Sequence, residues 1–162
     1  AGGWDACALR SLLRSTFLGS LDDSVQLAIV PVVKYQQLLR SETDASTKTT
    51  LQRTASETIW LPSMYEVFGK PANTADFSGF TPSESLTTVA DYAPFQYQAY
   101  QGNNGSVANA RAIKDLNGGA ARWWLRSAYW GAVNYFCDVS PQGSRDANSA
   151  NVLYGVIPAF CL

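Results

Sequence analysis

A run of aromatic and polar residues near the end of the chain carries the side chains best suited to binding another molecule. It combines large amphipathic rings with Asn, Ser, Asp and Arg side chains. In binding surfaces, Tyr and Trp supply contact area at low entropic cost, while Ser and Asn adapt their hydrogen bonds. This composition predicts recognition rather than catalysis. The candidate ligand-binding residues are Tyr129, Trp130, Asn134, Tyr135, Ser144, Arg145, Asp146, Asn148, Asn151, Leu153 and Tyr154.

The residue types in this set predict a division of roles. The Tyr and Trp rings would anchor the ligand, and Arg145 and Asp146 would provide charge complementarity. The alternatives are an ordinary solvent-exposed loop for the aromatic residues and a polar hairpin for residues 144–151. Because clustered exposed aromatic side chains usually mark an interaction site, binding is the favoured interpretation.

Catalytic and metal-binding chemistry finds little support in the composition. The chain contains no His, which removes the commonest general base and the commonest transition-metal ligand. The chain has an odd number of cysteines, Cys7, Cys137 and Cys161, and their spacing is not that of a metal site. Cys137 and Cys161 each follow a Phe in an apolar pattern, so both are predicted to be buried structural residues, with a disulfide as the alternative. We expect no cofactor, no metal and no enzymatic activity.

The length of the chain predicts a single folded domain that covers residues 1–162. Its 17.6 kDa are enough for a hydrophobic core. The net charge of -1 gives no basic surface, so nucleic acid is not an expected partner. No apolar run approaches the roughly 20 residues that cross a bilayer, and membrane insertion is not expected. The N-terminus does not resemble a signal peptide, which predicts a domain excised or processed from a longer protein.

Helices are predicted in the first part of the chain, with short elements after them. Ser20 is the expected N-cap of a second helix that ends at Pro31. Residues 30–35 and 59–61 are predicted strands, and residues 40–56 a Ser- and Thr-rich loop. Pro62-Ser63 should open a short helix closed by Gly69. Residues 70–94 form a long insertion, 96–100 a helical segment and 102–105 a turn. The first helix has apolar residues at helical spacing before Gly19: Leu9, Leu12, Leu13 and Phe17.

The last third of the sequence changes to the period of a β-strand. Trp123 and Leu125 should share one face of a strand, with Trp124 and Arg126 on the other. Core packing is expected for the two Trp residues and Leu125, and a structural hydrogen bond for Arg126. Residues 135–139 and 156–162 also alternate, and residues 141–143 are predicted to form a turn. Helices followed by a small antiparallel sheet define an α+β fold.

Several motifs together resemble a family of uncharacterised C-terminal modules found on surface and phage-associated proteins of gut bacteria. The resemblance covers nearly the whole chain, and its closing motifs are the most specific. The matching segments are Gly2 to Trp4, Leu9-Arg10, Leu13, Phe17-Leu18, Val32 to Lys34, Trp60 to Ser63, Glu66 to Gly69, Tyr97 with Tyr100, Arg111 to Lys114, Trp123 to Ser127, Phe136 to Val139 and Gly155 to Cys161.

The resemblance implies a fold and a function. The family is similar to the C-type-lectin fold of variable proteins in diversity-generating retroelements, whose reverse transcriptase rewrites a C-terminal segment through errors at template adenines. It implies a single C-type-lectin-like domain with a variable segment at about residues 124–154. Such a domain is displayed on a virion or cell surface and binds a protein or glycan on a target cell, as part of a larger surface or tail protein.

The chain departs from the family pattern at a few positions, and other functions remain open. Cys7, Leu12 and Arg14 stand where Ser, Trp and Asn are common, and Ala128 replaces Pro. No Glu-Pro-Asn or Trp-Asn-Asp triplet of calcium-dependent sugar binders is present. One alternative is a non-diversified structural or adhesive cap of a surface fibre. Another is an oxidase that resembles formylglycine-generating enzymes and uses Cys137 and Cys161 as a pair, although a reactive cysteine needs an electropositive setting.

Overall fold

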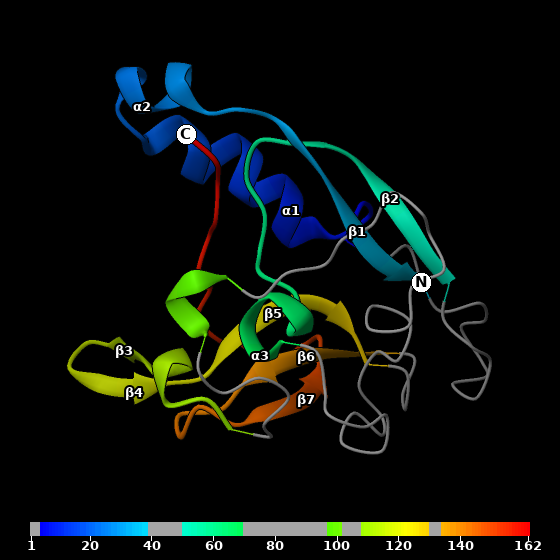
Figure 1. Cartoon of the computed structure of the whole chain (residues 1–162), viewed down its shortest axis with the longest axis vertical. Coiled ribbons are helices and arrows are strands. Elements are labelled where there is room, and N and C mark those ends of the chain that lie inside the picture. Colours follow the sequence, from blue (N-terminus) through cyan, green and yellow to red (C-terminus); the bar gives the residue numbers. More distant parts are fainter. Residues whose placement is uncertain (1–3, 39–49, 70–96, 102–107, 130–133) are drawn as a thin grey trace.

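Short helices and antiparallel strands make up the computed structural model, which describes residues 4–38, 50–69, 97–101, 108–129 and 134–162 (Figure 1). This combination confirms the predicted α+β class, although the first two strands precede the third helix. The predicted insertion at 70–94, the turn at 102–105 and the candidate residue Trp130 lie outside the described residues.

The first helix changes its winding in the middle. Helix α1 covers Ala8–Leu12 and continues into a π-helical turn over Leu13–Phe17 and a 3-10 turn over Leu18–Ser20. Leu13 is buried at 2% exposure while Leu12 is 55% exposed. Neighbouring residues point about 100° apart around a helix, and here Leu13 faces the core. The prediction that Leu12 belongs to the apolar side is therefore wrong.

The second helix begins later than the sequence predicted. Helix α2 covers Asp23–Ala28, and its N-cap is Asp22, whose Oδ1 accepts a 3.2 Å hydrogen bond from the Ser24 amide. A carboxylate at this position satisfies an otherwise unpaired amide and suits the helix dipole. Ser20 instead donates from its hydroxyl to the Phe17 carbonyl oxygen at 2.7 Å. The N-cap prediction for Ser20 is therefore wrong.

A two-stranded ribbon follows. Strand β1, Val32–Leu38, pairs antiparallel with β2, Thr50–Glu57. Strand β2 occupies part of the predicted loop at 40–56, so that prediction is wrong for residues 50–56. Its Thr residues are β-branched and suit a strand as well as a loop. In the predicted strand at 59–61, pairing is confined to a single bridge from Trp60 to Ala159.

The short central helix agrees with the prediction. Helix α3, Met64–Phe68, begins with a capping box in which Ser63 and Glu66 exchange side-chain to backbone hydrogen bonds. It ends at Gly69, whose φ of 74° is the left-handed conformation that favours glycine. All five of its residues are buried. Two 3-10 turns, Gln98–Tyr100 and Ala110–Ala112, and a hairpin of β3, Lys114–Leu116, with β4, Gly119–Ala121, complete this region.

The largest sheet is three-stranded and antiparallel. It contains β5, Trp123–Ala128, β6, Tyr135–Val139, and β7, Arg145–Ser149, in that spatial order. The predicted last strand at 156–162 is wrong, because this segment pairs only through isolated bridges at its start, Gly155 with Trp123, and at Ala159 with Trp60. Pro158 between them has no amide hydrogen to donate to a ladder.

Strand β5 separates two hydrophobic clusters. Trp123 and Leu125 belong to a cluster with α3 and Cys137, while Trp124 belongs to a second one with Trp4 and Trp60. All six residues of β5 are buried, which confirms core packing on both faces. Ala159 and Phe160 pack against the second cluster, so residues from the early and the late part of the chain both contribute to it.

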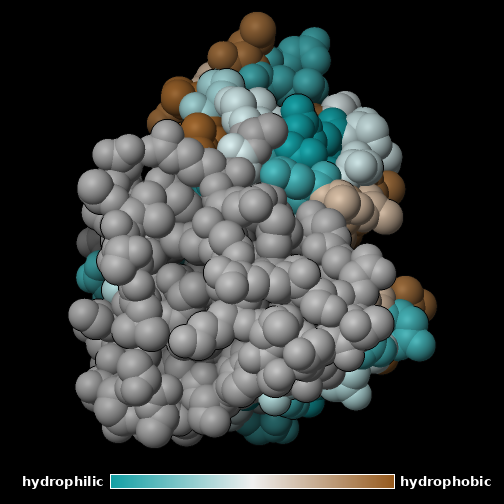
Figure 2. Space-filling view, turned by 90° about the vertical axis from the view of Figure 1, so that its right-hand side faces the viewer, coloured by the Kyte–Doolittle hydropathy of each residue, from teal (hydrophilic) through white to brown (hydrophobic). Residues whose placement is uncertain are grey.

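The end of the chain runs back to α2. The Val30 amide donates a 3.0 Å hydrogen bond to the Cys161 carbonyl oxygen, and Figure 1 shows the C-terminus beside α2. Leu27, Val30 and Leu162 are exposed in this region. Figure 2 accordingly shows hydrophobic and hydrophilic surface side by side at the top of the molecule.

Candidate ligand-binding face

Backbone pairing on both sides holds the segment that was predicted to bind ligand. At its start, the Trp124 amide donates to the Gly155 carbonyl oxygen at 2.9 Å, and the Gly155 amide donates to the Arg122 carbonyl oxygen at 3.0 Å. The Tyr129 amide donates to the Tyr135 carbonyl oxygen at 3.1 Å. These bonds involve only main-chain atoms, so they do not depend on the exposed side chains of the segment.

A tight turn joins β6 to β7, as predicted at 141–143. The Ser140 hydroxyl accepts from the amides of Gln142 at 3.2 Å and Ser144 at 3.1 Å. Gly143 has a φ of 77°, and a Cβ atom built there would lie 2.3 Å from the Asn109 carbonyl oxygen. Only glycine fits this conformation and this close approach.

The strand register distributes the candidate residues over two faces of the sheet. Asp146 pairs with Asp138 and Asn148 with Phe136, so they share the face that also carries Trp124. The other face of β6 and β7 carries Tyr135 and Arg145. The candidate residues thus do not form one flat surface on the strands.

Residues at the strand ends complete the candidate set. Tyr129 lies beside Tyr135, with ring centroids 6.2 Å apart. Asn134 and Asn151 are exposed, as is Leu153 with an exposure of 97%. The remaining described candidates are half-buried, including Ser144 and Tyr154.

A charged cluster underlies the face that contains Asp146 and Asn148. One guanidinium nitrogen of Arg122, Nη1, lies 2.6 Å from Oδ1 of Asp138 and 2.6 Å from Oδ2 of Asp146. Asn148 donates from Nδ2 to the other Asp138 oxygen at 2.8 Å. The Tyr154 ring packs on Trp124 at 4.8 Å and lies 5.5 Å from the Arg122 guanidinium. Three candidate residues therefore have partners in the framework.

Asp138 is fully buried within this cluster. Burial raises the pKa of its carboxyl group above the ordinary value, although the Asn148 and Arg122 hydrogen bonds lower it. Sequence reasoning did not single out Arg122 or Asp138. The available signal was an Arg directly before the Trp-rich strand and an Asp inside an apolar strand.

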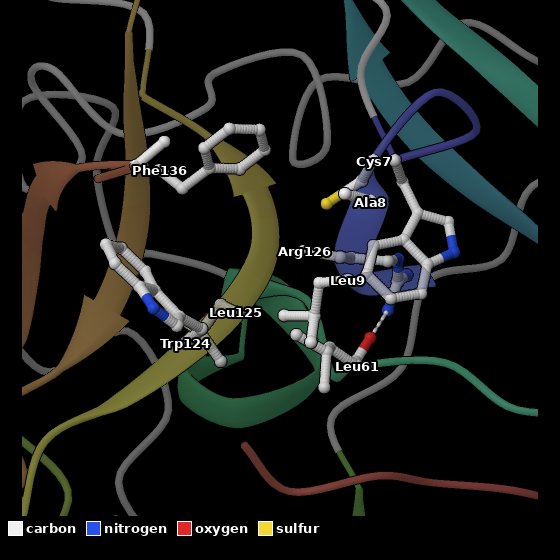
Figure 3. Close-up of a pocket in the computed structure, with 10 residues that line it drawn as sticks. Cys7, Ala8, Leu9, Leu61, Trp124, Leu125, Arg126 and Phe136 are labelled. Atoms are coloured by element: carbon white, nitrogen blue, oxygen red, sulfur yellow. Dashed lines mark hydrogen bonds between the residues drawn. The ribbon is translucent and has the colours of Figure 1, made fainter. Parts of the chain in front are cut away.

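A cavity of about 270 Å³ lies on the same face of the sheet, between the start of α1 and strands β5 and β6. Cys7 and Leu9 line it from the N-terminal side, and Trp124 and Phe136 line it from the sheet. Figure 3 shows the Cys7 sulfur pointing from the helix toward this space. The walls are mainly apolar.

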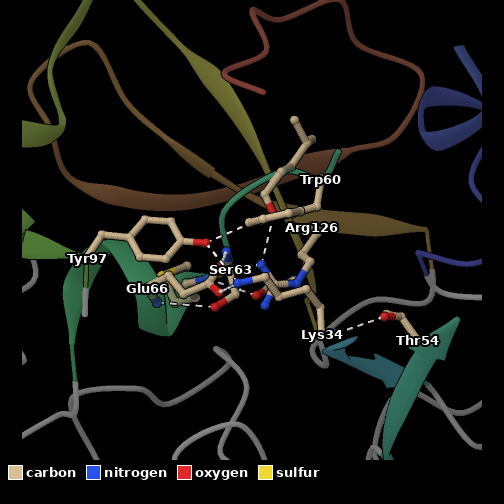
Figure 4. Close-up of polar contacts among 10 residues, drawn as sticks. Lys34, Thr54, Trp60, Ser63, Glu66, Tyr97 and Arg126 are labelled. Carbon is tan, nitrogen blue, oxygen red and sulfur yellow. Dashed lines mark hydrogen bonds and ion pairs between the residues drawn. The ribbon is translucent and has the colours of Figure 1, made fainter. Parts of the chain in front are cut away.

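A second polar network lies beneath the sheet and ties distant segments together (Figure 4). Glu66 on α3 forms a buried ion pair with Arg126 on β5, and its Oε1 lies 3.1 Å from the Lys34 ammonium on β1. Arg126 also donates to the Leu61 carbonyl oxygen at 2.8 Å. This confirms the structural role expected for Arg126.

Aromatic groups enclose the ammonium of this network. Lys34 Nζ lies 4.3 Å from the Trp60 ring centroid, and Trp60 Nε1 donates to the Tyr97 hydroxyl at 2.8 Å. Burial alone would raise the pKa of Glu66, but the charges of Arg126 and Lys34 outweigh it and lower the pKa to about 2. Glu66 is thus ionised at neutral pH and is neutralised by two cations.

The three cysteines occupy different environments. Cys137 is buried in the first hydrophobic cluster, as predicted, whereas Cys161 is exposed, so the prediction of a buried Cys161 is wrong. The physical reason is that residues 160–162 run along the surface instead of forming a strand. All three cysteines lie in the described ranges, and none forms a disulfide.

The part of the chain that the structure describes contains no group of three or more His, Cys, Asp or Glu side chains arranged to hold a metal ion. None of the helices in this part has the length and apolar character that a membrane crossing requires.

Comparison with known proteins matches this chain to a family model. No curated protein and no solved structure matches the chain. The sequence model of one family, described as a domain of unknown function, DUF6273, matches residues 1–162, and the chain therefore belongs to that family.

Proposed function

We propose that this chain is a ligand-recognition domain with a C-type-lectin-like fold, in which the segment from about 124 to 154 presents the binding side chains. A single contrast in burial supports the proposal most strongly. All six residues of β5 are buried, whereas all five residues of β7 are half-exposed. Side chains in the second group can change without emptying the core.

The arrangement of hydrogen bonds supports the same function. The candidate segment is held at both ends by main-chain bonds and by the turn at Gly143, while its buried side chains on β5 and β6 belong to the core, so its exposed side chains contribute little to its fold. A domain with this property tolerates sequence variation at its binding surface. We therefore propose that the segment is diversified by a retroelement through adenine mutagenesis, and that the domain binds a protein or glycan on a target cell.

In this proposal the domain belongs to a larger protein on a virion or cell surface. The alternative is a non-diversified cap of a surface fibre. The DNA around the gene separates the two. We expect a reverse-transcriptase gene and a non-coding near-copy of the segment for about Trp124 to Tyr154, with mismatches confined to template adenines. If both are absent, diversification is contradicted.

Binding is tested with side chains whose loss leaves the framework intact. Asn134, Asn151 and Leu153 are exposed and can be replaced together by Ala or Ser. Beads coated with the domain are scored for adhesion to a panel of bacterial cells. We expect the variant to lose adhesion while its unfolding free energy changes by about 1 kcal/mol or less.

The matched control replaces an equally exposed residue elsewhere. Leu27→Ser changes a leucine that is 88% exposed on α2, compared with 97% for Leu153. The control variant should adhere as the parent does. Equal adhesion of parent, control and triple variant would contradict the proposed binding surface.

A further inference from the structure

We infer that the cavity between α1 and strands β5 and β6 is an anchor pocket for one aromatic side chain of a protein ligand. The inference rests on the proposed function and makes its partner more specific. It assigns a site to residues that the candidate set does not include, among them Cys7, Leu9, Trp124 and Phe136.

The size of the cavity fits this occupant. It measures about 270 Å³, and an apolar cavity of roughly 150 Å³ already holds benzene. A phenyl, phenol or indole ring therefore has room to enter. Buried aromatic anchors carry much of the binding energy in protein interfaces, where surrounding contacts mainly exclude water.

The chemistry of the walls favours a protein over a glycan. Trp4, Leu9, Trp124 and Phe136 present rings and methyl groups, and Arg126 is engaged by Leu61 and Glu66. A sugar needs hydrogen-bond partners for its hydroxyl groups, and burying them without such partners costs free energy. The carbon atoms of an aromatic ring need no hydrogen-bond partners when they are buried.

The cavity is continuous with the candidate face. Phe136, which lines it, pairs across the strands with Asn148, and the ring of Trp124, which also lines it, packs against the Tyr154 ring. Ala150 lines it directly beside the exposed Asn151. A ligand bound at the candidate face would thus lie beside the cavity.

Cys7 provides a direct probe of occupancy. It lines the cavity and is half-buried, whereas Cys161 is exposed and Cys137 is buried. The cysteines are labelled with a thiol reagent in the presence of toluene, p-cresol or 3-methylindole, which mimic the side chains of Phe, Tyr and Trp. Mass spectrometry then measures the rate at which each cysteine is labelled. At a concentration ten times its Kd, one of these probes should slow labelling of Cys7 by about tenfold through mass action, with Cys161 unaffected. Mannose and galactose serve as sugar probes.

Blocking the cavity tests its role in ligand binding. Ala8 lines the cavity and is exposed, so a tryptophan ring introduced by Ala8→Trp should occupy or cover the cavity without disturbing the core. Ala28→Trp is the control, because Ala28 is also an exposed helical alanine but does not line the cavity. We expect Ala8→Trp to abolish protection of Cys7 and to reduce adhesion at least about tenfold, as loss of a main anchor does. Ala28→Trp should change neither.

The outcomes separate this inference from the proposed function. Protection of Cys7 by a sugar, or by no probe at all, would overturn the anchor pocket. So would normal adhesion of Ala8→Trp, because the cavity would then serve a free small molecule instead of the ligand. If the triple variant at Asn134, Asn151 and Leu153 loses adhesion in these cases, the proposed binding function stands without the pocket. If that variant adheres normally while Ala8→Trp does not, the proposed face is wrong and the pocket stands.

Discussion

Single residues in this domain divide into those that hold the backbone and those that face solvent, and the division does not follow residue type. Asp146 and Asn148 are polar, yet they bond to Arg122 and Asp138 beneath the face. Leu153 is apolar, yet it is almost fully exposed. Substitution tests must therefore be chosen by contact and not by polarity.

Gly143 is the residue whose replacement should matter most in the β6–β7 turn. Its positive φ and the 2.3 Å approach of a built Cβ to the Asn109 carbonyl oxygen predict that Gly143→Ala destabilises the fold by about 2–4 kcal/mol. Urea unfolding measures the change. Gly119→Ala is the control, since nothing lies within 4 Å of a Cβ there, and it should shift stability by about 0.5 kcal/mol or less. Equal effects would show that the close approach is not a constraint.

Replacing a buried and an exposed cysteine should have different effects on stability. Cys137→Ala removes a buried sulfur from the first cluster and should cost about 1–2 kcal/mol, whereas Cys161→Ala, at an exposed position, should be close to neutral. Thermal unfolding of both variants tests this. Adhesion should be unchanged in either one. Loss of an enzymatic activity with an intact fold would instead favour the oxidase interpretation.

At the scale of elements, the Glu66 network explains how α3, β1 and β5 are held together although they are distant in sequence. Glu66 caps its own helix through Ser63 while its carboxylate meets Arg126 and Lys34. A buried carboxylate between two cations is stabilising only while it is ionised.

This network predicts an acid dependence of stability. The pKa of Glu66 is lowered from 4.5 to about 2, so its contribution is present above pH 4.5 and is lost as the pH falls toward 2. Glu66→Gln should cost about 3–5 kcal/mol at pH 7, because two cations lose their partner. Its unfolding free energy should also fall less steeply than that of the parent between pH 4.5 and 2. Parallel curves of unfolding free energy against pH for the parent and Glu66→Gln would contradict this linkage. The raised pKa of Asp138 makes stability change with pH in the opposite direction, but it is present in both proteins and cancels in the comparison.

The sequence predicted elements best where one local pattern decided the structure. The alternation of Trp123 and Leu125 against Trp124 gave the right faces, and Ser63 with Glu66 gave the right helix start. The predicted last strand was wrong because alternation describes side chains, whereas a strand also needs a partner along its length. That pairing depends on contacts far away in the chain.

The candidate site was less accessible to sequence reasoning. The types of the side chains do not reveal how the strands pair. In the structure, the strand register places Tyr135 and Arg145 on one face of the sheet and Asp146 and Asn148 on the other. The Arg122–Asp138 contact and the cavity arise from segments that meet only in the folded chain. The predicted role of Trp130 stays a prediction, since this residue lies outside the described ranges.

At the scale of the whole molecule, the second hydrophobic cluster draws on nearly the full length of the chain. Trp4 and Leu13 come from its beginning, Trp60 and Trp124 from its middle, and Phe160 from its end. Removal of residues 155–162 should therefore disrupt this cluster, the Trp60–Ala159 bridge and the Val30–Cys161 hydrogen bond together. We expect the shortened chain to lose cooperative thermal unfolding in calorimetry; a sharp transition near that of the parent would contradict this.

The contribution of Ala159 and Phe160 to the second cluster has a consequence for synthesis on the ribosome. The segment that closes the second cluster is translated after the proposed variable segment, so the domain cannot complete its core until that segment has been read through in frame. A stop codon or frameshift introduced between 124 and 154 would leave Trp4 and Trp60 without Ala159 and Phe160. Such a product would expose apolar surface and become a substrate for cellular proteases. Faulty copies would thus be removed after synthesis, while in-frame replacements at exposed positions would pass.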